Sequence, residues 1–386
     1  MATSRRAVRL LAPVALLGFV LPLAFGPRAA TAQEPGHSMG TGIHFQSYSF
    51  DEALGTDVAN LTLLPVAYTL PLGGRVSVDL YGAYALGSVE KEGVEYTLQG
   101  PVDTRLRASV RLAPWAALTA AVNLPTGQST HSAEEAVVAS VLSTDLLGFR
   151  EATWGTGSSV TTGLALARQA GEWGVGVAGS YRLANGFEPR EGQDLTYEPG
   201  DEIRLRVAVD RNVGEAGTFT AGLTVQSFAR DEYDGRNLFQ AGNRFRGDVS
   251  YAFRTGRSTW ALYATDMWRE EGDRFLYYQG DPGAEPDSTL VVGSQNLLMA
   301  GLNGSIPLGS QVRLRPSLDV RYQSRDAGTG EGWLVGGGAE VPFRTGGSFA
   351  LAPRGRVSWG QLQSSGGEKE SLWGVEVGLM IRWQGR

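Results

Sequence analysis

The sequence predicts an all-β fold: a transmembrane antiparallel β-barrel of about 16 strands, with one short helix in a long extracellular loop. Three observations predict this fold. An export signal is followed by no apolar helix, long segments alternate with a period of two, and the connections fall into two alternating lengths. A barrel of 14 strands is the alternative, because the first pair of strands is the least distinct.

The export signal has a basic start with three arginines, an apolar run over 10–25 and an A-x-A cleavage site that ends at Ala32. A helix needs about 20 apolar residues to span a bilayer, and this run is shorter. We therefore expect a signal peptide at 1–32 and a single barrel domain at 33–386. The absence of cysteine excludes a disulfide framework, and the net charge of −6 gives no reason to expect a nucleic-acid partner.

The alternation is clearest in the segment QVRLRPSLDVRYQ at 311–323, where one parity is apolar and the other is polar without a break. Successive side chains of a strand point to opposite faces, whereas a helix would scatter the three arginines. The division recurs at 102–112, with Val102 on the apolar parity, and at 202–211, 244–253 and 373–383. A soluble β-sandwich also alternates, but strands of globular proteins are usually about 5–6 residues long.

The connections between the predicted strands alternate in length, as in outer-membrane barrels with short periplasmic turns and long outer loops. Short turns are expected at 72–74, 113–114, 169–171, 212–217, 255–257, 308–309 and 345–347. Longer polar stretches lie at about 91–100, 125–153, 186–200, 229–237, 270–288, 324–331 and 364–370. Tryptophans near the predicted strand ends fit an aromatic girdle: Trp115, Trp173, Trp260, Trp333, Trp359, Trp373 and Trp383.

The polar parity of the predicted strands is rich in arginine and should face the lumen, because arginine at the bilayer midplane costs about 2–4 kcal/mol. The predicted pore-lining residues are Arg105, Arg107, Arg111, Arg204, Arg206, Arg244, Arg246, Arg313, Arg315, Arg321, Arg354, Arg356 and Asp319. One interpretation is a water-filled pore that attracts anionic solutes. The other is a set of arginine–carboxylate pairs that brace the wall, and both can hold together.

The segment after Pro125 changes character from strand to helix. Pro125 cannot donate to a strand ladder, and Ser132 with Glu135 forms an S-x-x-E capping box. Helical spacing follows in the residues of a predicted constriction loop: Val137, Val138, Val141, Leu142 and Leu146. The helix either lies on the outer rim or folds into the barrel mouth, and its apolar stripe slightly favours the mouth.

Catalysis is not expected. His131 is the candidate base, but no G-x-S-x-G motif occurs, and the letters GVGVAG at 174–179 lie inside an alternating strand rather than before a helix. The acidic loops are interpreted as solvated carboxylates rather than calcium sites. We therefore predict no cofactor, no metal site and no catalytic residue.

The motif NLPTG at 123–127, at the end of a strand and before a long loop, resembles outer-membrane proteins of the family named for the MetA pathway of phenol degradation. The resemblance implies transport of aromatic or other apolar compounds. We expect an outer-membrane channel for passive passage of small aromatic or anionic organic solutes, in contact with outer-membrane lipid and lipopolysaccharide. The alternative is a non-conducting structural or surface-interaction barrel, and the oligomeric state, monomer or trimer, stays open.

Overall fold

The computed structural model describes residues 36–385 except 52–55, 215, 278–285, 327–329 and 364–366. The predicted signal peptide lies outside the described residues. The strands of the main sheet are β1 (Ser38–Phe50), β2 (Val58–Leu72), β3 (Val76–Lys91), β4 (Val94–Pro101), β5 (Thr104–Ala113), β6 (Ala116–Leu124), β7 (Ser159–Ala170), β8 (Trp173–Ala184), β10 (Glu202–Val213), β11 (Gly217–Phe228), β14 (Arg244–Thr255), β15 (Ser258–Arg269), β18 (Gln295–Pro307), β19 (Arg313–Arg325), β20 (Gly332–Glu340), β21 (Phe343–Gly346), β22 (Phe349–Gln363) and β23 (Lys369–Gln384).

These strands form a closed antiparallel barrel of sixteen wall positions, counted over the described residues. β4 and β5 share one position beside β3, and β20 and β21 share one beside β22. The barrel closes where β1 pairs with β23 along its whole length. The start of β1 lies beside the end of β23, since Ser38 pairs with Gln384, and the predicted count of 16 is confirmed.

The outer surface of the barrel is apolar over its lower and middle parts. On β10, for example, Ile203, Leu205 and Val207 are each at least half exposed, while the arginines between them are partly buried on the inner face. A closed sheet leaves no unpaired strand edge, and such an apolar exterior is the surface of a barrel that crosses a membrane. On β15 the outward residues Trp260 and Trp268 lie eight residues apart, which is ~27 Å along the strand and matches two aromatic girdles.

Two sequence predictions about the wall were wrong. The stretch 91–100 was expected to be a loop, but β3 continues to Lys91 and pairs with β4 through a tight turn at Glu92 and Gly93. Both turn residues have positive φ, 52° and 75°, as a two-residue hairpin turn requires. Val102 was placed toward lipid, but the wall strand breaks between β4 and β5, and Val102 is buried inside.

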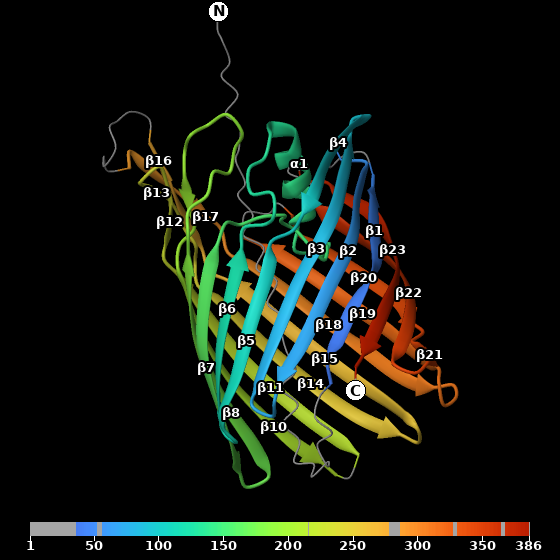
Figure 1. The fold of residues 1–386 in the computed structure, drawn as a ribbon. Coiled ribbons are helices and arrows are strands. Elements are labelled where there is room, and N and C mark those ends of the chain that lie inside the picture. Colours follow the sequence, from blue (N-terminus) through green and yellow to red (C-terminus); the bar gives the residue numbers. More distant parts are fainter. Residues whose placement is uncertain are drawn as a thin grey trace, which may run out of the picture.

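A second sheet of five short strands was also missed. Its strands are β9 (Tyr197–Glu198), β12 (Arg230–Tyr233), β13 (Arg236–Gln240), β16 (Gly272–Leu276) and β17 (Ser288–Val292), in the order β17-β16-β13-β12-β9. They come from the stretches 186–200, 229–237 and 270–288, which were predicted to be loops. The loops pair with one another because each is long enough to continue the barrel wall beyond the membrane (Figure 1).

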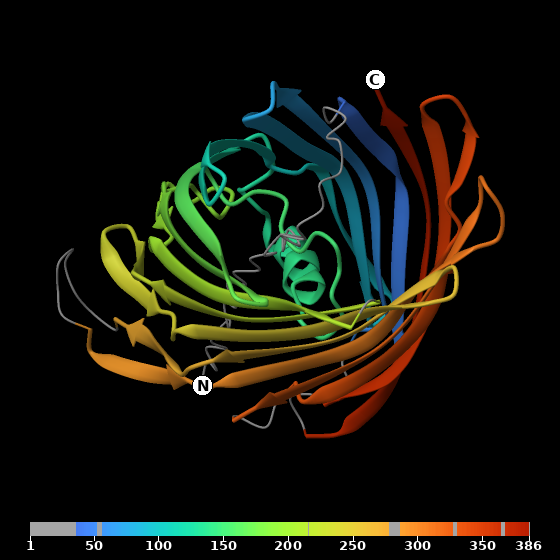
Figure 2. The same cartoon turned by 90° about the horizontal axis from the view of Figure 1, so that it is seen from below.

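The single described helix, α1 (Ala133–Leu142), belongs to the segment 125–158 between β6 and β7, which we call the plug segment. Seen along the barrel axis, the helix lies inside the ring of strands (Figure 2). Among the described residues, no helix is long and apolar enough to cross a lipid bilayer. The interior of the barrel thus contains the helix of the plug segment, within the ring of strands (Figure 2).

Candidate functional site

The root of the plug segment is held by one buried carboxylate, Asp103, at the break between β4 and β5. Its oxygens accept hydrogen bonds from the Gly127 and Thr156 backbone N–H groups at 3.0 and 2.8 Å, and from Asn123 Nδ2 at 2.8 Å. Only glycine fits at position 127, because a Cβ on Gly127 would lie 1.9 Å from the Trp154 carbonyl oxygen. The NLPTG motif thus fastens both ends of the plug segment to the wall.

The helix packs by its apolar stripe against the inner wall. Its capping box is formed as predicted, since Ser132 Oγ accepts from the Glu135 N–H and Glu135 Oε2 accepts from the Ser132 N–H. Val138 and Leu142 are fully buried and reach Gly87 on β3, where a Cβ would lie 2.8 Å from Leu142 Cδ1. Of the other predicted constriction residues, Leu146 is buried, Val141 packs against the same cluster and Val137 is half-buried.

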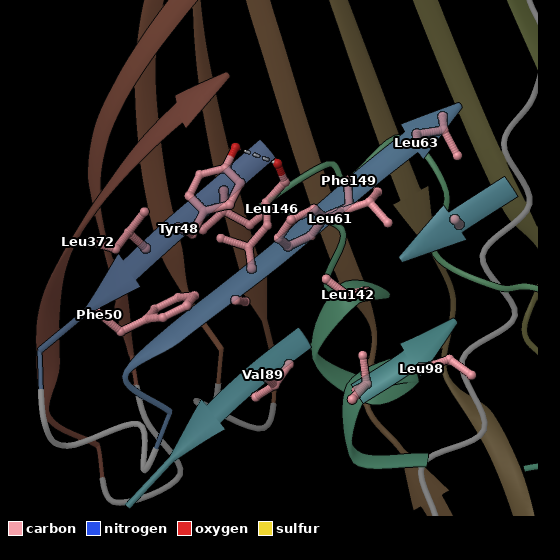
Figure 3. Packing of buried hydrophobic residues seen from close by; sticks show 14 of the residues in the cluster. Tyr48, Phe50, Leu61, Leu63, Val89, Leu98, Leu142, Leu146, Phe149 and Leu372 are labelled. Carbon is pink, nitrogen blue, oxygen red and sulfur yellow. Dashed lines mark hydrogen bonds between the residues drawn. The ribbon is translucent and has the colours of Figure 1, made fainter. Parts of the chain in front are cut away.

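The cluster that receives the helix fills one side of the barrel interior (Figure 3). It includes Leu61 and Leu63 from β2, Leu98 from β4, and Leu146 and Phe149 from the plug segment. The apolar stripe is therefore turned toward the wall. The segment takes up space in the lumen as a whole, with Val138, Leu142 and Leu146 packed in the cluster and Val141 against it.

The inner end of the plug segment is tied down by polar contacts. Tyr48 Oη donates to the Leu147 carbonyl at 2.8 Å, and Arg321 Nη1 donates to the same oxygen at 3.0 Å. Tyr81 Oη donates to Glu151 Oε1 at 2.7 Å, and Arg105 lies 3.9 Å from the other oxygen. Burial raises the pKa of the Glu151 carboxyl, against the smaller lowering effects of Tyr81 and Arg105.

Two arginine–carboxylate forks cross the inner wall in the same way. Arg206 on β10 reaches over Gly222 on β11 and donates to both oxygens of Asp248 on β14, at 2.7 and 2.9 Å. A Cβ at Gly222 would lie 2.5 Å from the guanidinium. Each fork therefore joins three strands, and only glycine on the middle strand leaves room for the arginine.

The second fork lies farther round the ring, on β19, β20 and β22. Arg356 on β22 reaches over Gly336 on β20 and donates to both oxygens of Asp319 on β19. Glu376 on β23 continues the row, 3.6 Å from Arg356 and 2.5 Å from Arg354. These contacts support the predicted bracing role for several of the inward arginines.

The other predicted inward arginines differ in their surroundings. Arg204 pairs with Glu202 at 2.7 Å and Arg315 with Glu340 at 2.8 Å, while Arg111 and Arg313 are exposed near the end with the short turns. Arg107 faces Asp79 in the β3–β5 register. Arg244 and Arg246 lie near the outer end of β14.

Water reaches this arginine-lined face. The side chains of Arg105 and Arg315 are 39% and 41% exposed although both lie on the inner parity of a closed wall. A cavity of ≈ 430 Å³ lies below the plug segment, and its lining includes Gly148, Arg150, Arg315 and Arg354. The lumen therefore contains solvent-accessible space bordered by guanidinium groups.

Four residues of this interior were not identified from the sequence: Asp145, Glu151, Arg269 and Arg325. Arg269 and Arg325 continue the polar parity of their strands by one more alternation, so a longer reading of the pattern would have found them. The two acids gain their roles from contacts between distant segments, such as the bond between Asp145 and Gln295.

The candidate catalytic base, His131, lies away from the inward arginines of the strands. His131 lies at the entrance of the plug segment, where its backbone pairs with Pro189 and Glu191 and burial lowers the pKa of its imidazole. Within the described ranges, no group of three or more His, Asp or Glu side chains could hold a metal ion.

No protein-family model matches the chain, and no curated protein matches it. Among solved structures, it is similar to a bacterial polysaccharide outer membrane secretin, at 10% identity over 90% of this chain and 98% of that chain, with a TM-score of 0.45. It is also similar to the CymD monoaromatic hydrocarbon channel, at 10% identity over 91% and 89%, with a TM-score of 0.42.

An outer membrane channel from Pseudomonas putida F1 is 16% identical over 72% of this chain and 99% of that chain, with a TM-score of 0.37. Identities and TM-scores this low establish neither a family nor a function. The resemblance of NLPTG to the MetA-pathway family is not confirmed by them.

Proposed function

We propose that the protein is a channel of the bacterial outer membrane through which small solutes pass passively. The observation that carries this proposal is the solvent-accessible, arginine-lined space inside a closed barrel with an apolar exterior. Lipid and lipopolysaccharide would cover the outer surface, and a water-filled interior with rings of charged side chains is the usual construction of an ion- or solute-selective pore.

The favoured solutes are small organic anions. Inward arginines outnumber inward acids, and a positive lumen with low-dielectric walls raises the local concentration of anions. An aromatic ring in these anions is compatible with the resemblance of NLPTG to transporters of aromatic compounds. The pore-lining role of the thirteen residues predicted from the sequence is part of this proposal.

Planar lipid bilayers test the proposal directly. Purified folded protein should give discrete conductance steps, and in a potassium chloride gradient the reversal potential should indicate preference for chloride. A denatured sample and an empty detergent control should give no steps. Absence of steps at any voltage would refute the channel, and a cation-selective reversal potential would refute the anion preference.

A non-conducting barrel is the second candidate, and the plug segment favours it. The segment is fastened at its root by Asp103 and at its inner end by Tyr48, Tyr81 and Arg321, so it is built as a fixed part of the interior. The conductance measurement separates the two candidates, because a sealed lumen gives no steps in the wild-type protein.

A further inference from the structure

A row of directly paired inward residues crosses six neighbouring strands near the outer end of the barrel. The cross-strand register joins these residues one after another: Arg204, Gln226, Arg244, Arg269, Gln295 and Arg325. We call this row the guanidinium rung. Four of its six members are arginine and none is an acid.

The rung costs stability as it stands. Arg244 and Arg269 are directly opposite each other on β14 and β15, and like charges in that position repel. Arg325 Nε is buried and has no hydrogen-bond partner. A wall that served only as a brace would pair each of these arginines with an acid, as the two forks lower in the barrel do.

The acids near the rung serve only part of it. Glu202 pairs with Arg204 at 2.7 Å and accepts from Gln226 at 2.8 Å, so that end is neutralised. Glu270 and Asp326, which follow Arg269 and Arg325 in the chain, are bonded to Asn243 and Ser294. Among the described residues, no ion pair joins Arg269 or Arg325 to an acid of the wall, whereas the charge of Glu202 also acts on Arg244.

Of the described carboxylates, the one that faces Arg269 and Arg325 comes from the plug segment. Asp145 Oδ2 accepts a hydrogen bond of 2.9 Å from Gln295, whose Oε1 accepts from Arg269 at 3.0 Å. Its charge acts on Arg244, Arg269 and Arg325. Among the described residues, no ion pair within 4.0 Å joins Asp145 to Arg269 or Arg325, so the two guanidinium groups keep donors for another ligand.

We propose that the guanidinium rung is a capture site for small organic carboxylates and that Asp145, which is bonded to Gln295 of the rung, is a tethered carboxylate that competes with the solute. The class follows from the group now present, because a planar guanidinium fork matches a carboxylate. This inference rests on the proposed channel function and names its solute class and entry site. The rung would hold the solute at the mouth before it reaches the arginines below.

The test measures binding and conductance separately, so that the two proposals can fail independently. Isothermal titration calorimetry of the folded protein in neutral detergent measures the affinity of the rung for sodium benzoate, whether or not the lumen conducts. Asp145→Asn should tighten benzoate binding about tenfold, which is ~1.4 kcal/mol, because the competing carboxylate is gone. Arg269→Gln should weaken it about tenfold, and Asp145→Glu should restore the wild-type affinity.

Matched controls carry the same charge changes elsewhere. Glu134→Gln removes an exposed carboxylate from the same plug segment, and Arg168→Gln removes an exposed arginine from β7. Both should stay within twofold of the wild type. Arg325→Gln is a second rung variant in case Arg269→Gln fails to fold.

Three outcomes would overturn the inference. They are an unchanged benzoate affinity in Asp145→Asn, an unchanged benzoate affinity in both arginine variants, and binding of inorganic phosphate as tight as that of benzoate. The third outcome would mean that the rung binds any anion and does not select carboxylates. A protein that binds benzoate in this pattern yet gives no conductance steps would keep the rung and refute the channel.

Discussion

Replacing Gly336 by alanine should break the fork between Arg356 and Asp319 without touching either partner. The register places Gly336 on β20 directly between Asp319 on β19 and Ser358 on β22. A Cβ at this position would lie 2.0 Å from Arg356 Nη2, so the guanidinium has to leave Asp319. The addition of one methyl group should therefore break a bidentate ion pair.

The expected cost is about 3 kcal/mol. Both side chains of the fork are only 11% exposed, and separating a buried pair typically costs about 3–5 kcal/mol. The lower end applies because each partner keeps a second contact: Arg356 Nε lies 3.6 Å from Glu376, and Asp319 lies 3.5 Å from Arg321. The measurement is urea unfolding from lipid vesicles, followed by tryptophan fluorescence.

Gly337→Ala is the matched control, since a Cβ there meets its nearest atom at 3.7 Å, an ordinary contact. It should change the unfolding free energy by less than about 0.5 kcal/mol. Adding Arg356→Met to Gly336→Ala should cost little more than Arg356→Met alone, because both remove the same fork. Additive costs in this double-mutant cycle, or equal costs for the two glycines, would refute the reasoning.

Two further predictions concern the plug segment. In Asp103→Asn, the amide at position 103 cannot accept hydrogen bonds from all of the present donors, so the root of the plug segment should loosen and limited proteolysis within 125–158 should become faster. The control is Asp194→Asn, which changes an exposed carboxylate. Equal cleavage rates in the two variants would contradict the role of Asp103. Because burial raises the pKa of Glu151 above its usual 4.5, its contribution to stability is fully present below pH 4.5 and is lost as the pH rises through the raised pKa. The urea midpoint of Glu151→Gln should therefore depend less on pH than that of the wild type between pH 4 and 8, and identical pH profiles would contradict it.

The barrel itself was predictable because its wall offers only two environments. A residue faces either lipid or the lumen, so a period of two over ten or more residues assigns each side chain to one of these two faces. The lengths of the turns then show how the strands follow one another around the barrel. The segment 311–323 shows this, since β19 covers most of it with the predicted parity. The capping box at Ser132 was equally local and equally predictable.

The internal arrangement could not be read in the same way. The fork from Arg206 to Asp248 depends on Gly222, and these residues meet only through the register of three strands. Gln295 and Asp145 are 150 positions apart in the chain. Parity identifies such residues as inward, but neither parity nor spacing says which guanidinium is paired and which is left open.

One local signal would have located the plug segment against its wall. In β2, Ala59, Leu61 and Leu63 face inward and are buried, and beyond them Leu64 and Val66 are exposed on the outer face. The apolar parity therefore changes sides between residues 63 and 64. Below that point the outside meets lipid and must be apolar, whereas above it the wall stands in water and the inside must be apolar.

The inverted alternation extends to the neighbouring strands and explains why the plug segment packs where it does. Val89 on β3 and Leu98 on β4 face inward and are buried, while Asn60 and Ser88 bond to each other on the outer parity. An inward apolar surface has to be covered, and the stripe of α1 covers it. The guanidinium rung lies on β10 to β19, where the polar parity stays inward to the outer strand ends, so the same rule that makes one side of the mouth apolar leaves the inner face of the other side polar.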